Sequence, residues 1–235
     1  MMASGALRLQ NRGRGPGRWA VLPACGPRCG HRAWTGTGRQ PQCALYSSAV
    51  SAVSEPAGKN RPEVTVRRLD ALSARRHLDD LADLLVDAVE GGSSVSFVAP
   101  LAHYEARDWF AGVLHEMELG RRVVLAAFLG DRLVGCAQLV LAWQSNATHR
   151  AEVQKMVVHR SARRMGIGAL LMHRLEVEAR TLGRTLLILD TETGSDAEHL
   201  YSHMGWTRVG VYPDYAMRPD GSGLRPTSLW YRRLD

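Results

Sequence analysis

One short stretch constrains this chain more than any other, the glycine-containing loop Arg163-Arg164-Met165-Gly166-Ile167-Gly168-Ala169. It follows the apolar run Met156-Val157-Val158 and opens a long amphipathic pattern that ends at Gly183, which indicates a strand-to-helix turn. Amides at a helix start lack intrahelical partners and the positive end of the helix dipole lies there, so glycines at this point let a phosphate approach the backbone. The stretch is therefore either a phosphate-binding loop or a simple tight turn.

The spacing of this loop separates it from two common nucleotide motifs. A dinucleotide fingerprint needs Gly-x-Gly-x-x-Gly, and a Walker A loop needs Gly-Lys-Ser/Thr; neither is present. The pattern Arg-x-x-Gly-x-Gly after a strand resembles the coenzyme A loop of the GNAT N-acetyltransferase superfamily. Two departures from the usual form are Arg160, where a proline is common, and Arg164, where a further glycine is common. The resemblance implies that the loop binds the coenzyme A phosphates.

The positive charge of the chain is concentrated at its start. The net charge is +7 over 235 residues, but residues 1–62 hold nine basic residues against Glu55 alone, so the remainder is nearly neutral. A nucleic-acid partner is therefore not expected. No apolar run approaches 18 residues, and no membrane span is expected. Cys25, Cys29 and His31 lack a second pair at zinc spacing, and no metal site is predicted.

Residues 1–62 read as an appendage, and residues 63–235 read as the folded domain. Gly, Arg, Pro, Ser and Ala dominate the first 54 residues, which hold no acidic residue and show no periodicity. Such a segment cannot bury enough apolar surface to order itself, so a disordered arm is predicted. An Arg-rich, acid-poor start is also typical of a mitochondrial presequence, and a start codon assigned too early is a third interpretation. The predicted location is cytoplasmic, or the mitochondrial matrix if the presequence is real.

The periodicity of residues 63–235 predicts alternating strands and helices. A helix is expected over 74–90 with Ser73 as its N-cap, and others over 103–118, 166–182 and 197–204. Strands are expected over 64–69, 122–129, 133–141, 152–158, 186–190, 206–212 and 229–233. This order resembles the GNAT order throughout. It implies an α/β GNAT fold, a mixed central sheet of six to seven strands that is splayed at the middle and flanked by helices.

Three side chains are predicted to carry the chemistry of acetyl transfer, which needs a base for the amine and an acid for the departing thiolate. Glu152 opens the central strand, where several GNAT enzymes have a glutamate base; the alternative is a strand-end surface carboxylate. Asp190, at the end of an apolar run, is the second candidate base, a ligand of a cationic substrate, or a cap of the next turn. Tyr201 matches the family segment Tyr-x-x-x-Gly-aromatic and is the candidate acid, or else a packing tyrosine.

The resemblance also implies a set of residues for the cofactor, acetyl-CoA as acetyl donor. A backbone amide of the central strand is expected to bind the thioester oxygen. The full set consists of that strand, the loop and a helix start: Met156, Val157, Val158, Arg163, Arg164, Met165, Gly166, Ile167, Gly168, Ala169 and Ser195.

A closer resemblance concerns the acceptor. The segments Gly91–Phe97, Arg150–Lys155 and Leu189–Glu198, together with Thr207–Gly210, are similar to the tabtoxin-resistance acetyltransferases of plant-pathogenic bacteria. The resemblance implies transfer of acetyl to the amine of a small molecule, in toxin or antibiotic resistance. A protein N-acetyltransferase and a non-catalytic acetyl-CoA sensor are the alternatives. The chain is expected to be a monomer or a homodimer.

Overall fold

The structure is a computed structural model that describes residues 63–234. The predicted arm over residues 1–62 lies outside the described residues. Seven strands and five α-helices follow one another in the order that the sequence predicts, except that two helices stand where one was expected. The elements are β1 Val64–Leu69, α1 Ala71–Arg76, α2 Leu78–Glu90, α3 His103–Glu118, β2 Arg122–Leu129, β3 Arg132–Leu141, β4 Arg150–Val158, α4 Ile167–Thr181, β5 Leu186–Glu192, α5 Asp196–His203, β6 Thr207–Met217 and β7 Leu224–Arg233, with a 3-10 turn at Arg160–Ala162.

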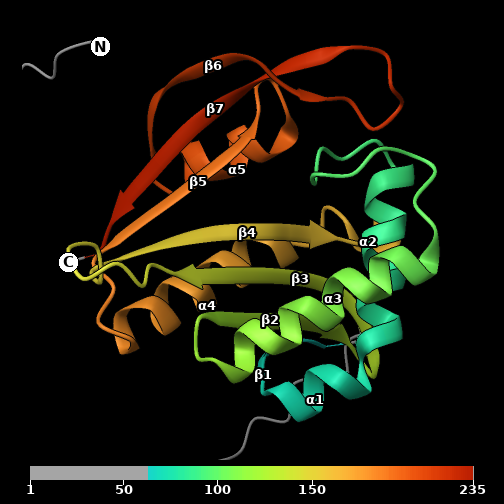
Figure 1. The fold of residues 1–235 in the computed structure, drawn as a ribbon, viewed down its shortest axis with the longest axis horizontal. Coiled ribbons are helices and arrows are strands. Elements are labelled where there is room, and N and C mark those ends of the chain that lie inside the picture. The colour runs from blue at the N-terminus through green and yellow to red at the C-terminus, as the bar shows by residue number, and fades with distance from the viewer. Residues whose placement is uncertain (1–62, 235) are drawn as a thin grey trace, which may run out of the picture. The chain divides into compact units, whose positions relative to one another are not determined.

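The seven strands form one mixed sheet in the order β1-β2-β3-β4-β5-β7-β6. Neighbours are antiparallel except for β4 and β5, which run parallel and are joined by the crossover helix α4. These two strands pair only from Arg150↔Leu186 to Glu152↔Ile188 and then separate toward their carboxyl ends (Figure 1). The prediction of a mixed α/β sheet splayed at the middle is therefore confirmed.

Helices cover both faces of the sheet and divide the core into two layers. On one face, α1, α2 and α3 pack against Val124, Ala126 and Phe128 of β2. On the other face, α4 packs against Val123 and Leu125 of the same strand, because successive side chains of a strand point to opposite faces, and α5 belongs to the same apolar layer (Figure 1). Each layer is contiguous and apolar, so the sheet is held rigidly between the helices and can position groups at its splayed edge.

The prediction of one helix over 74–90 capped by Ser73 was wrong. Asp70 is the N-cap of α1, its carboxylate accepts the Ser73 amide at 2.6 Å, and the chain breaks at His77 before α2 begins. The His77 ring lies edge-on against Phe128, with the ring centroids 5.2 Å apart, and its Nδ1 lies 2.8 Å from the Asp80 carboxylate. These contacts separate two short helices that share one apolar stripe, which is why the stripe alone indicates a single helix.

The last two strands are longer than predicted. β6 continues past residue 212 and β7 begins five residues before 229, and the two form a hairpin in which β7 lies inside and β6 at the sheet edge. The register shifts twice along β6, between Arg208 and Gly210 and between Tyr212 and Ala216. Most β6 side chains are exposed, so the strand lacks the apolar alternation that reveals strands in a sequence. In the described part of the chain, no helix is long and apolar enough to cross a bilayer.

Candidate functional site

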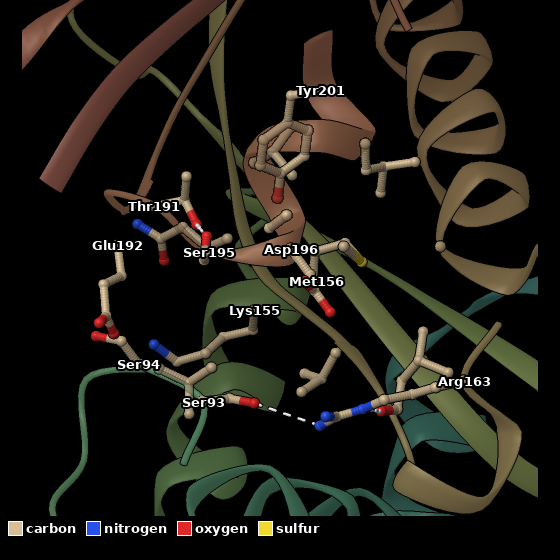
Figure 2. A pocket seen from close by; sticks show the side chains of 18 of the residues that line it. Ser93, Ser94, Lys155, Met156, Arg163, Thr191, Glu192, Ser195, Asp196 and Tyr201 are labelled. Carbon is tan, nitrogen blue, oxygen red and sulfur yellow. Dashed lines mark hydrogen bonds between the residues drawn. The ribbon is translucent and has the colours of Figure 1, made fainter. Parts of the chain in front are cut away.

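A deep cleft opens where β4 and β5 separate. It has a volume of about 800 Å³ and is lined by the second half of β4, the glycine loop, the end of β5 and the start of α5. The loop over residues 91–96 and Tyr215 of β6 line the side of the cleft that also holds Glu152 and Asp190, which we call the acceptor side because it is the side expected to receive the acceptor. Figure 2 shows side chains of the loop after α2, of β4, of the end of β5 and of the start of α5 around one space. The cleft therefore brings together most residues that the sequence analysis assigns to the site.

The glycine loop presents free amides to this cleft. Gly166 is the N-cap of α4 with φ 80°, a left-handed conformation that favours glycine. Within residues 63–234, the amides of residues 164–169 donate to no protein acceptor, since the first intrahelical bond runs from the Leu170 amide to the Gly166 carbonyl. A Cβ at Gly166 would meet no atom within 4 Å, so the space beside the loop is open. Free amides, open space and a helix start fit an anionic phosphate.

The second glycine serves packing as well. A Cβ at Gly168 would lie 3.3 Å from Cδ2 of Leu200, so α4 passes close to α5 at this point. Ile167 is fully buried among the apolar residues of α4 and the sheet. Met165 does not line the cleft and packs against that same core instead. Of the predicted loop residues, the cleft is thus lined by Arg163, Arg164, Gly166, Ile167, Gly168 and Ala169.

The two loop arginines differ in how they are held. Arg163 Nε donates to the Val158 carbonyl at 3.1 Å, and Nη2 donates to Ser93 Oγ at 3.4 Å (Figure 2). Arg163 therefore connects the end of β4 to the loop after α2. Arg164 is almost fully exposed, its backbone is left-handed at φ 61°, and its guanidinium lies 4.0 Å from Asp196. Both arginines add positive charge beside the free amides.

An ion pair between the buried Asp87 and the half-exposed Arg160 holds the segment that leads into the loop. The Asp87 carboxylate in α2 accepts the Arg160 amide at 3.0 Å and Arg160 Nε at 2.7 Å. Burial acts to raise the pKa of Asp87, but the hydrogen bonds from Arg160 and the charge of His159 outweigh it, and the pKa lies below its ordinary value. Arg160 replaces the proline that the family resemblance leads one to expect, and this contact explains how the segment stays ordered without it.

A bulge in β4 changes which face its side chains occupy. Gln154 pairs with Gln138, and Val157 pairs with Cys136, so two residues of β4 oppose one residue of β3. Lys155 sits in the bulge with φ 48°. Before the bulge, Val153 packs with the α4 side; after it, Val157 packs with the α2–α3 side. Beyond residue 152 this strand has no β5 partner, so its edge faces the cleft.

The two predicted carboxylates line the acceptor side. Glu152 accepts a hydrogen bond from Gln154 Nε2 at 2.8 Å, and Arg122 donates to the same Gln154 amide at 3.3 Å. Asp190 accepts from Thr227 Oγ1 at 3.2 Å. The charge of Asp190 first, and then burial and the charge of Glu152, raise the pKa of the nearby Tyr215 phenol, so both carboxylates act on this part of the cleft.

Tyr201 lies at the opposite side of the cleft, on α5. Its side chain is 4% exposed and packs against Trp206 and Trp230, with ring centroids 5.9 and 6.3 Å away. Its hydroxyl points into the cleft between Ser195 and Met156 (Figure 2). Burial first, and then the charge of Asp190, raise the pKa of this phenol far above its ordinary value. Tyr201 therefore stays protonated, and its hydroxyl faces the cleft as a hydrogen-bond donor.

Three features of the cleft were not assigned from the sequence. They are Lys155, whose side chain enters the cleft from the bulge, the loop over 91–96, and Tyr215. Ser195, which was assigned, is the N-cap of α5, and its hydroxyl lies 3.3 Å from Thr191 Oγ1. Among the described residues, no group of His, Cys, Asp and Glu side chains could hold a metal ion.

Comparison with known proteins identifies the family. The model of the GNAT acetyltransferase family matches residues 80–206. The chain belongs to the GNAT acetyltransferase family. An uncharacterised N-acetyltransferase from Azospirillum brasilense is 35% identical to this chain over 130 residues, which cover 54% of this chain and 75% of that protein. This GNAT chain is accordingly an N-acetyltransferase.

Solved structures share the fold at low sequence identity. A ribosomal-protein-alanine N-acetyltransferase from Brucella melitensis is 22% identical, with a TM-score of 0.61 over 72% of this chain and 99% of that one. An acetyltransferase from Salmonella typhimurium, solved with its cofactor acetyl-CoA, is 19% identical, with a TM-score of 0.59 over 73% and 94% of the two chains. At these identities the likeness shows the fold alone.

The cleft of this acetyltransferase fits the cofactor of its family, acetyl-CoA. The free amides of residues 164–169 and the positive charges of Arg163 and Arg164 suit its phosphates. The unpaired edge of β4 beyond Glu152 offers backbone groups to the extended amide-containing arm. When bound, acetyl-CoA supplies the acetyl group as a thioester.

Proposed function

We propose that this acetyltransferase moves the acetyl group to the primary amine of a small molecule, with Glu152 as the general base. The observation that carries the proposal is the position of Glu152 and Asp190, which both line the part of the cleft that is bordered by Tyr215 and the loop over 91–96. Because the same cleft must also hold the arm of the cofactor, the space left for the acceptor is small. Two carboxylates at the border of this limited space favour a compact cationic amine over an extended polypeptide.

The proposed reaction assigns one task to each group. Glu152 takes a proton from the acceptor ammonium, directly or through water, and the neutral nitrogen attacks the thioester carbon. A backbone amide of β4 beyond the bulge donates to the carbonyl oxygen as negative charge develops there. The carbon–sulfur bond breaks, Tyr201 gives its proton to the departing thiolate, and the second proton leaves the nitrogen through water and restores the Tyr201 hydroxyl. The acetylated amine and the free thiol are the products.

Glu152 is preferred over Asp190 as the base because a chain of hydrogen bonds holds its carboxylate in place. The amide of Gln154 fixes the Glu152 carboxylate, and Arg122 in turn fixes Gln154 through a hydrogen bond from Nη1; the same Nη1 donates to Gln138 at 2.6 Å. Asp190 accepts a hydrogen bond from a single hydroxyl, and its charge acts on the pKa of Tyr201. Asp190 is then the group that orients the acceptor ammonium.

The proposal is tested by following thiol release from acetyl-CoA with a panel of small amines. The panel includes amino acids, toxin-like dipeptides and aminoglycosides, and the full chain is used. Glu152→Gln keeps the shape and the hydrogen-bonding of the side chain but removes the base, so we expect turnover to fall by about 100-fold or more. Acetyl-CoA binding, measured by calorimetry, should stay unchanged. Full turnover in Glu152→Gln, with loss in Asp190→Asn, would transfer the role to Asp190.

A second candidate function is N-terminal acetylation of a protein. Two solved structures with the same fold are ribosomal-protein-alanine N-acetyltransferases, one from Brucella melitensis and one from Escherichia coli, and this likeness favours the second function. The Escherichia coli protein is 16% identical to this chain, with a TM-score of 0.55. Peptides that begin with alanine therefore belong in the panel. Turnover of such a peptide without turnover of any small amine would favour this function. Tight acetyl-CoA binding without turnover of any acceptor would favour a sensor, and the closer resemblance to tabtoxin-resistance enzymes stays a prediction.

A further inference from the structure

Lys155 is unlike every other cation of the domain. Residues 63–235 contain twenty arginines and this single lysine, and the lysine stands in the bulge of the central strand, with its side chain in the cleft. An ammonium is a compact point charge with three donors that rotate freely, whereas a guanidinium is a broad planar fork. A domain that otherwise uses arginine thus has its lysine in the cleft, on the strand that carries Glu152.

The ammonium of Lys155 is held in place by a hydrogen bond and two aromatic rings, but no carboxylate of the described residues pairs with it. Nζ donates to Ser96 Oγ at 3.0 Å and lies over the rings of Trp109 and Phe97, 5.1 and 5.8 Å from their centroids. In residues 63–234, no carboxylate lies within 4.0 Å of it. Two of its three N–H donors are therefore free to meet a ligand. Figure 2 shows the ammonium pointing away from Met156 and Tyr201, toward the acceptor side.

Both partners of the hydrogen bond adopt a backbone that side chains disfavour. Lys155 has φ 48° and Ser96 has φ 73°. A left-handed conformation at a residue other than glycine is costly and is concentrated at functional sites, where the surrounding structure enforces it. The bulge directs Lys155 toward the α2–α3 side, and the turn at Ser96 brings its hydroxyl to meet the ammonium. Two strained positions that converge on one hydrogen bond indicate a site rather than a solvated surface lysine.

The carboxylates of the cleft contribute to the electrostatics of this ammonium from a distance. Burial first and Arg122 second lower the pKa of Lys155, and the charges of Asp190 and Glu152 oppose that shift. Glu152 lies three residues before Lys155 on the same strand, which separates their backbones by about 10 Å at most. A molecule with an amine and an anionic group a few bonds apart can bridge them. Its amine meets Glu152 and Asp190, and its anionic group meets the free donors of Lys155 and the hydroxyl of Ser96.

We infer that the acceptor of this acetyltransferase carries a carboxylate close to its amine, as an amino acid or a short peptide-like compound does, and that Lys155 with Ser96 binds that carboxylate. The inference rests on the proposed function, because it takes the acceptor to be a small amine. It gives Lys155 the role of a specificity residue that contacts the substrate. It also explains why the cleft that holds the carboxylates of Glu152 and Asp190 contains an ammonium that pairs with neither of them.

The test uses acceptor pairs that differ only in the carboxylate. L-amino acids with different side chains are compared with their carboxamides, with acetyl-CoA and the full chain, and kcat/KM is measured from thiol release. A carboxamide makes the neighbouring amine less basic and so supplies more of the reactive neutral form, which works against the expected preference. The wild-type protein should favour the carboxylate by about 10- to 100-fold, the worth of a charge-assisted hydrogen bond.

Variants at Lys155 decide whether it causes the preference. Lys155→Met keeps the length of the side chain without its charge and should abolish the preference, mainly by raising KM for the amino acids, while the carboxamides keep their rates. Lys155→Arg should retain part of the preference. Arg107→Met removes a surface cation that pairs with Asp79 on the outside of α3, and it should change nothing. Because the ratio within each pair is measured on one protein, a variant that is partly unfolded still gives a valid ratio.

Three outcomes would overturn the inference, and they separate it from the proposed function. A wild-type protein that acetylates amino acids and carboxamides equally well would refute the inference and leave the proposed function intact. An equal loss in Lys155→Met for both members of a pair, with a shifted acid limb of the pH profile, would mean that Lys155 only tunes Glu152 and Asp190. Absence of turnover with every small amine would refute the proposed function, and this inference with it.

Discussion

Replacing Gly166 by alanine should damage cofactor binding beyond its effect on stability, and Gly183→Ala provides a matched control. Gly166 begins α4 with φ 80°, and Gly183 follows the end of the same helix with φ 68°. A methyl group added at either position would meet no atom within 4 Å. Each substitution should therefore lower the free energy of unfolding by the same amount, about 1–2 kcal/mol for a left-handed alanine. This loss lowers Tm by roughly 2–8 °C for a domain of this size.

The two variants should differ only in their affinity for acetyl-CoA. The methyl group at residue 166 projects into the open space beside the free amides of residues 164–169, where a phosphate would bind. Losing one charge-assisted hydrogen bond costs about 1.5–3 kcal/mol, so Kd should rise by about 10- to 100-fold. Gly183→Ala should leave Kd unchanged. Calorimetric titration with acetyl-CoA gives Kd, and thermal unfolding gives Tm. Equal loss of affinity in both variants, or none in Gly166→Ala, would refute the assignment of this loop to the phosphates.

Two further predictions follow from buried groups. Tyr201→Phe should lower kcat by about 100-fold with unchanged acetyl-CoA affinity, because the substitution removes only the hydroxyl and keeps the ring packed against Trp206 and Trp230; an unchanged kcat would leave Tyr201 a packing residue. Asp87 has a folded-state pKa below its ordinary value, so its ionised form stabilises the fold above about pH 4 and this contribution disappears as the pH falls through the folded pKa. Urea unfolding should therefore show Asp87→Asn less stable than the wild type by about 1–3 kcal/mol at pH 7, with a smaller gap at pH 3; a gap that does not depend on pH would contradict this account.

Local requirements explain which parts of the fold the sequence predicts well. The loop before α4 needs small residues and an exposed helix start, and both requirements are visible in seven consecutive letters. The hairpin between β2 and β3 turns at Gly130, whose φ of 60° and position between two apolar runs give a strong local signal. The elements that meet these local rules were predicted to within a residue or two.

Long-range pairing explains what was missed. Nothing within the last 30 residues indicates that β7 inserts between β5 and β6, because the pairing of Asp190 with Leu229 depends on contacts across the sheet. The closing of the acceptor side by Tyr215 follows from this pairing and from the irregular register of β6. The carboxylates Glu152 and Asp190 could be named because Glu152 opens one local apolar pattern, at a place that the family resemblance marks, and Asp190 ends another. Their surroundings could not, because those come from distant segments.

The bulge in β4 has one signature in the sequence, which is the position of Lys155 in the strand pattern. If side chains alternated without interruption from Ala151 and Val153, the next position on that apolar face would belong to Lys155. A lysine there would bury a charge against α4 without a partner, which is prohibitively costly. A break in the alternation at this residue is the inexpensive solution, and it transfers Val157 to the opposite core and directs the lysine into the cleft. The one residue that does not fit the strand pattern thus marks the point where the strand stops serving the core and begins to serve the acceptor site.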